Sequence, residues 1–283
     1  MRTPKDWARL VAKGFAMGAA DLVPGVSGGT IAFITGIYEE LISTIAGLGP
    51  STVVDLYNEG VVSTWKKHNL NFLVALFVGI VCAVLVLSNA IHYLQETHTI
   101  YLNSFFLGLV IASTPIIWRS VASKSKSNYA FVAVGIVVAA ILTSLPHSVE
   151  TTSPLFIALS GAIAISAMLL PGISGSFILL VLGAYAPIIA GLAGLDFIVI
   201  SSFFIGIVGG VLTFSRLLKR VLSKYHDQTL SILVGFMLGA LHVLWPWGKT
   251  TLPESGDVEV SFVFVWIIVG AIFVTGLSKL SSK

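Results

Sequence analysis

The chain has 283 residues, of which 56% are hydrophobic and 10% are charged, and its mean hydropathy is +0.96. Because soluble domains carry about 25% charged residues, this composition excludes an ordinary soluble domain and predicts a polytopic membrane protein. The formal net charge of +3 comes from Lys and Arg clusters between apolar runs, which is typical of topology signals and not of nucleic-acid binding. The single cysteine, Cys82, lies within an apolar run, so we expect no disulfide, no metal site and no cofactor.

The first half begins with a basic amphipathic segment, residues 1–13, followed by a broken apolar stretch at 14–48. Residues 24–29 (Pro-Gly-Val-Ser-Gly-Gly) cannot continue a helix, and their flanks, 14–23 and 30–48, are shorter than or barely equal to the roughly 20 residues of a span. Residues 49–70 are too polar to span and are expected along the membrane interface. Three apolar runs then predict spans at 71–94, 101–118 and 128–146.

The second half repeats this order. A second broken stretch, 155–195, contains residues 171–176 (Pro-Gly-Ile-Ser-Gly-Ser), and further spans are predicted at 197–215, 228–246 and 261–278. Moving the chain by 147 residues aligns 14–48 with 161–195, so that the two Pro-Gly-x-Ser-Gly motifs coincide. The later spans align at a shift of 127 residues, which pairs Gly108 with Gly235.

The positive-inside rule orients both halves. Lys and Arg gather at the N-terminus, at 66–67, 119–127 and 216–227, and at Lys279 and Lys283, so both termini are expected in the cytoplasm, whereas 247–260 is net acidic. Each broken stretch then starts and ends on one side, as either a re-entrant hairpin or a pair of tilted spans; the short flanks favour hairpins.

These patterns together predict the fold. We expect an all-α polytopic membrane protein with two inverted-topology repeats, residues 1–146 and 147–283, each a re-entrant helical hairpin plus three transmembrane helices. The second repeat is upside down because each unit crosses the membrane an odd number of times. Inverted repeats with discontinuous helices that meet near the midplane are the architecture of alternating-access transporters.

The two breaks predict an anion site. A helix that restarts after each Pro-Gly has a serine as N-cap, and its first turn presents N–H groups at the positive end of the helix dipole. The predicted anion contacts are Ser27, Gly28, Gly29 and Thr30 on one side and Ser174, Gly175 and Ser176 on the other. The alternative is that each break is only a packing kink or a hinge.

Four charged residues are candidates for coupling or for a secondary contact to the anion. Asp21 either carries a coupling proton or caps local backbone, and Glu39 is either a second coupling group or an ordinary interfacial residue. Lys13 either reaches an anion at the cytoplasmic mouth or only sets topology. Arg119 is either a phosphate partner or a snorkelling side chain at the end of a span.

The residues that carry these features resemble a known family. The motifs are Lys13-Gly14, Ala20-Asp21-Leu22-Val23-Pro24-Gly25-Val26-Ser27-Gly28-Gly29-Thr30, Gly36-Ile37-Tyr38-Glu39 and Pro171-Gly172-Ile173-Ser174-Gly175-Ser176. Over essentially the whole chain, the sequence resembles the bacterial polyprenyl-phosphate transporters. The resemblance implies a non-enzymatic protein of the bacterial cytoplasmic membrane that returns undecaprenyl phosphate, the lipid carrier of cell-wall synthesis, from the outer to the inner leaflet.

Two alternatives remain open at the level of sequence. Intramembrane polyprenyl-pyrophosphate phosphatases also resemble inverted repeats with Pro-Gly-x-Ser loops, but they have an arginine directly after the serine, where this chain has Gly28 and Gly175. Without that arginine to stabilise a transferring phosphoryl group, we expect no hydrolysis and no catalytic residue. The second alternative is a secondary transporter of a small soluble anion, because the same motifs would bind such an anion equally well. For the lipid reading, the expected partners are polyprenyl phosphate, membrane lipids and protons.

Overall fold

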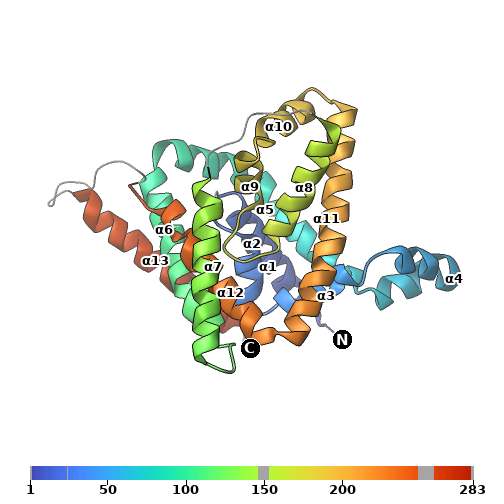
Figure 1. Cartoon of the computed structure of the whole chain (residues 1–283), viewed down its shortest axis with the longest axis horizontal. Helices are drawn as coiled ribbons and strands as arrows, with labels where there is room; N and C mark the ends of the chain where they lie inside the picture. The colour runs from blue at the N-terminus through green and yellow to red at the C-terminus, as the bar shows by residue number, and fades with distance from the viewer. Residues whose placement is uncertain (1, 24, 146–152, 248–257, 282–283) are drawn as a thin grey trace.

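The computed structural model describes residues 2–23, 25–145, 153–247 and 258–281, and every regular element in these ranges is helical (Figure 1). The prediction of an all-α protein is confirmed for this part of the chain. Pro24 of the first break, the last residue of the predicted span 128–146 and most of the acidic segment 247–260 lie outside the described residues.

Within the described residues, six helices are long and apolar enough to cross a membrane, and each overlaps one predicted span. They are α5 (Leu70–Thr97), α6 (Thr99–Trp118), α7 (Lys126–Ser144), α11 (Phe197–Lys224), α12 (His226–Gly239) with the 3-10 helix η1 (Ala240–Leu244), and α13 (Val258–Ser281). These helices lie where the spans are predicted, with one difference in length. Helix α11 continues past residue 215 to Lys224, because the Lys, Arg and Leu residues there are good helix formers.

Each broken stretch folds into three helices. Helix α1 (Pro4–Asp21) runs from the predicted amphipathic segment 1–13 into the first stretch, which continues with α2 (Gly28–Ile34) and α3 (Tyr38–Ala46). The second stretch corresponds to α8 (Pro154–Met168), α9 (Gly175–Val181) and α10 (Tyr185–Ala193). The flank 30–48, expected as one arm, is therefore broken a second time. Gly36 (φ 69°) and its counterpart Gly183 (φ 72°) adopt the left-handed conformation, which ends a helix. Helices α9 and α10 meet at 106°, the bend of a broken span or a re-entrant loop.

Four helix pairs enclose the short helices α2 and α9 (Figure 1). Helix α1 packs along α5 and α8 along α11, whereas α7 packs on α12 and α13 on α6, so the last span of each half pairs with the other half. Glycines allow the close approach: a Cβ on Gly108 would lie 1.9 Å from the carbonyl oxygen of Ile267, and one on Gly270 would lie 1.9 Å from that of Phe105. Small residues at such crossings are typical of membrane helix pairs.

Helix α4 (Pro50–Lys67) projects from this body (Figure 1). It is kinked at Gly60, and Lys67 Nζ joins its two segments by lying 2.8 Å from both Asp55 Oδ1 and Glu59 Oε1. Hydrogen bonds from Lys67 and His68 hold the pKa of Asp55 below its usual range. The exposed apolar side chains of α4 favour the predicted interfacial position; they include Val53, Val54, Tyr57, Val61 and Val62.

Gly270→Ala is expected to destabilise the protein by about 1–3 kcal/mol, because the new methyl group overlaps the backbone of α6. The measurement is thermal unfolding of the purified protein in detergent. Gly276→Ala on the same helix is the matched control, since no atom lies within 4 Å of the Cβ it adds. Equal losses of stability in the two variants would contradict the close packing of α13 on α6.

Candidate functional site

The N-terminus of α2 is capped by two side chains that precede it in the chain. Ser27 Oγ accepts a hydrogen bond from Gly29 N at 3.1 Å, which confirms the predicted N-cap. Asp21, the last residue of α1, accepts a hydrogen bond from Gly28 N through Oδ1 at 2.7 Å. The chain returns from α1 to α2 through Gly25, whose φ is 86°. In this conformation, therefore, the first two N–H groups of α2 donate to oxygens of the chain itself.

A lysine holds the opposite end of α2. Lys13 Nζ donates a hydrogen bond to the carbonyl oxygen of Thr35 at 2.7 Å. The carboxylate of Asp21 at the N-terminus of α2 and the ammonium of Lys13 at its C-terminus both complement the helix dipole. The second half has Met168 and Ser160 at the aligned positions, so α9 lacks both charges. The two breaks therefore differ in charge although they share a sequence motif.

The two breaks lie directly against each other, although 141 residues separate Ser27 from Met168 in the chain. Ser27 Oγ lies 3.3 Å from the carbonyl oxygen of Met168 and 3.2 Å from that of Leu170. The Ser27 hydroxyl can donate a hydrogen bond to only one of these oxygens at a time, and its oxygen also accepts the hydrogen bond from Gly29 N. Ser27 is 0% exposed, so these bonds form away from solvent.

Two more hydroxyl groups of the first half extend this contact. Thr30 Oγ1 accepts a hydrogen bond from Gly172 N at 3.2 Å, and the Tyr38 hydroxyl donates to the carbonyl oxygen of Leu169 at 2.9 Å. Both Thr30 and Tyr38 are buried. The first half therefore binds the backbone of the second break with side chains from α2 and α3 and from the N-cap of α2.

The start of α9 differs from the start of α2. Ser174 makes no capping hydrogen bond with its side chain; its hydroxyl lies 2.9 Å from the hydroxyl of Ser176. Both hydroxyls belong to the predicted anion contacts. Ser174 and Gly175 are buried, whereas Ser176 is partly exposed. The predicted residues on each side thus lie together, and the two sides meet through the backbone from Met168 to Gly172.

The other charged candidates lie apart from the breaks. Glu39 Oε1 is 3.2 Å from His226 Nε2, beside a cavity of about 270 Å³ that Lys219 also lines. Arg119 is exposed at the end of α6. Among the described residues, no group of three or more His, Cys, Asp and Glu side chains is placed to hold a metal ion. The contacts of Glu39 and Arg119 thus do not include the two breaks.

The sequence patterns assign no role to Tyr38, which the structure places in the contact between the two breaks. Tyr38 and Tyr185 occupy aligned positions of the two broken stretches, and this repeat is the signal that points to Tyr38. From the sequence, Arg216 is, like Arg119, either a snorkelling side chain at the end of a span or a secondary phosphate partner. Its guanidinium donates to the carbonyl oxygens of Ala46 (3.4 Å) and Leu48, and so caps the C-terminal end of α3.

Interrupted helices that meet among helices long and apolar enough to span a membrane define a polytopic membrane protein, and broken helices of this kind form the substrate sites of many transporters. The chain belongs to the undecaprenyl phosphate translocase-like (VCA0040-like) family, whose model matches residues 17–259. It is 44% identical to a polyprenyl-phosphate transporter of Vibrio cholerae over 239 residues, 84% of this chain and 77% of the relative. It is 32% identical to a polyprenyl-phosphate transporter of Staphylococcus aureus over 290 aligned positions, 95% of this chain and 93% of the relative. No solved structure matches the chain.

Proposed function

We propose that this chain carries polyprenyl phosphate across the bacterial cytoplasmic membrane and is not an enzyme. Two findings support the proposal: the family and relatives just described, and the direct contact between the two Pro-Gly breaks. The contact is the observation that carries the mechanism, because it joins helix starts from both halves at one place inside the bundle. A phosphate head group bound there interacts with both halves at once.

Transport by alternating access requires two units that move against each other, and we assign them to residues 1–146 and 147–283 as inverted repeats. Several features support this assignment. Gly25 and Gly172 have φ values of 86° and 87°, and α5 and α11 each have 28 residues. The helix pairs also correspond: α1 with α5 matches α8 with α11, and α13 with α6 matches α7 with α12. Each half then contributes one hairpin and three spans.

The head group is assigned to Ser27, Gly28, Gly29 and Thr30 on one side and Ser174, Gly175 and Ser176 on the other. The starts of α2 and α9 have different caps, and this difference determines which helix start the phosphate contacts first. Helix α9 has no side-chain cap at its start, whereas Asp21 already occupies Gly28 N of α2. A phosphate therefore meets Ser174 and Ser176 first, and it reaches α2 when it displaces the carboxylate of Asp21. Proton binding by Asp21 favours that displacement, which would make protons the coupling ions.

Contacts between basic segments support the proposed orientation in the membrane. Asp227 accepts hydrogen bonds from Ala122 N (3.1 Å) and Ser123 N (2.7 Å), which ties the segments 119–127 and 216–227 together. Arg2 lies 2.5 Å from Glu40, and the neighbouring Glu39 contacts His226, so the N-terminus lies close to the segment 216–227. The beginning of α1 and the end of α13 lie on this same side (Figure 1). These basic segments support a cytoplasmic position for both termini.

The test is leaflet-resolved movement of fluorescent polyprenyl phosphate in liposomes that contain the purified protein. We expect movement above protein-free liposomes, with no release of inorganic phosphate from polyprenyl pyrophosphate. Phosphate release would identify an enzyme. Uptake of inorganic phosphate without movement of the lipid would identify a transporter of soluble anions, and either result would overturn the proposed function.

A further inference from the structure

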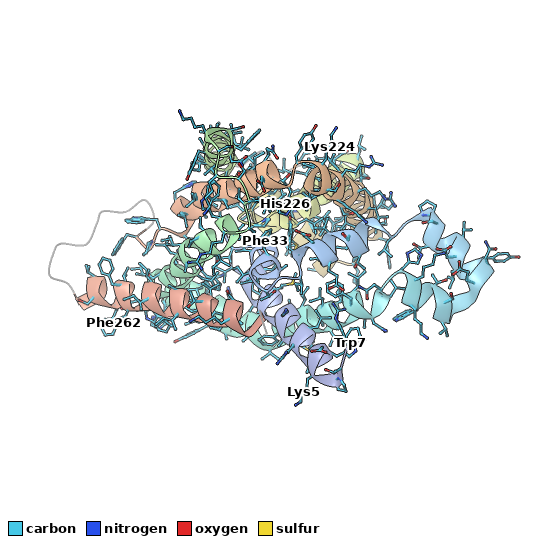
Figure 2. All side chains as sticks on the ribbon, turned by 90° about the horizontal axis from the view of Figure 1, so that it is seen from below. Lys5, Trp7, Phe33, Lys224, His226 and Phe262 are labelled. Carbon is cyan, nitrogen blue, oxygen red and sulfur yellow. The ribbon has the colours of Figure 1, made fainter. Side chains whose placement is uncertain are left out.

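A cavity of about 810 Å³ lies between α1 and α5 on one side and α6 and α13 on the other. In Figure 2, Phe33 of α2 is near the centre, with Trp7 of α1 and Phe262 of α13 on opposite sides of it. The cavity wall contains residues from these four helices and Ile31 of α2. Its volume is that of a site for a small organic ligand.

The lining of this cavity suits a hydrocarbon. It contains no Asp, Glu, Lys or Arg, and its polar groups are confined to His98, Tyr101 and the indole of Trp266. Alanines of α1, such as Ala16, form one wall, and aromatic rings, such as Phe105, form the opposite wall. Burial of hydrocarbon against such a surface is favourable, whereas an ion here would lack partners.

The cavity reaches the first break. Ala20 and Ile31 both line it, and they are the immediate neighbours in sequence of Asp21 and Thr30. A lipid whose phosphate lies at the start of α2 therefore has an apolar space beside its head group. We propose that this cavity binds the isoprene units nearest the phosphate, so that the protein recognises the tail of its substrate as well as its head. This inference rests on the proposed function.

The volume sets how much of the tail is recognised. The cavity, of about 810 Å³, lies within the size range of ligand sites and is too small for the whole of a long polyprenyl tail. The rest of a longer tail stays in the bilayer. The rate of transport should therefore rise with tail length until the cavity is filled and change little beyond that length.

The experiment compares variants that fill the cavity with a variant that does not. Ala16→Phe and Ile91→Trp place new bulk in the cavity from α1 and α5, and Ala130→Phe, on an exposed position of α7, is the matched control. Transport of undecaprenyl phosphate by the two cavity variants is expected to fall roughly tenfold or more, because buried tail contacts are lost. The control should transport like the unchanged protein. Thermal unfolding in detergent is measured for all three, so that a cavity variant is compared only if it is folded.

A second measurement locates the tail itself. Farnesyl phosphate with a photoreactive group on its tail is expected to label α1, α5, α6 and α13, and excess undecaprenyl phosphate should prevent that labelling. Equal labelling by a phospholipid with the same group, labelling confined to other helices, or equal transport by cavity and control variants would overturn the tail site. If the cavity variants transport as well as the control does, the tail site is wrong but the proposed function still holds. If the unchanged protein moves no polyprenyl phosphate, the proposed function fails, and the tail site fails with it.

Discussion

Asp21→Asn is expected to remove the pH dependence of transport while leaving head-group binding intact. The amide oxygen of asparagine can still accept the hydrogen bond from Gly28 N, which Asp21 now receives at 2.7 Å, so the start of α2 keeps its cap. The asparagine amide neither gains nor loses a proton in this pH range, so any step that depends on protonation of this side chain is lost. The measurement is the rate of lipid movement in liposomes at several pH values, together with binding of a short-chain polyprenyl phosphate.

Asp21→Ala is the companion variant that separates coupling from structure. It leaves Gly28 N in a buried place without its acceptor, which costs about 1–3 kcal/mol of stability. Thermal unfolding should therefore distinguish the alanine variant from the asparagine variant. If Asp21→Asn loses binding and transport together, Asp21 has a structural role and the proton-coupled displacement is wrong.

Ser27→Leu and Ser174→Leu are each expected to stop transport. Ser27 is 0% exposed and Ser174 6% exposed, so a leucine at either position enters the space between the two breaks. The expected losses of stability differ. Either leucine overpacks the site, which costs about 1–3 kcal/mol, but Ser27→Leu also removes the cap of α2, worth about 1 kcal/mol. Ser27→Leu should therefore be the less stable of the two.

Lipid movement and thermal unfolding are measured on the same preparations of both variants. Ser201→Leu, on an exposed position of α11, is the matched control and should retain transport. Folded Ser27→Leu and Ser174→Leu proteins with normal transport would remove this pair of serines from the mechanism. Loss of transport in the control would show that the assay reports overall stability and not the site.

Charged side chains were the hardest part of the site to predict. The sequence left two roles open for Lys13 and two for Asp21, and the structure places both at the ends of α2 as caps. Arg216 likewise binds the end of α3. A charged side chain in an apolar stretch costs free energy wherever it lies, so its presence indicates that it has a polar partner. Which backbone group becomes that partner depends on how a helix folds back, and spacing along the chain does not contain that information.

The sequence alone determined the helical class, the positions of the six long apolar helices in the described residues and the two Pro-Gly breaks, because hydrophobic length and helix-breaking residues are local properties. It missed the second break at Gly36 and Gly183, since an isolated glycine in an apolar run is compatible with a continuous helix. Only the tertiary structure decided that the last span of each half packs on the other half, and that Ser27, Thr30 and Tyr38 bind the second break. These contacts join residues that lie far apart in the sequence, and they depend on close packing at glycines that no local pattern specifies.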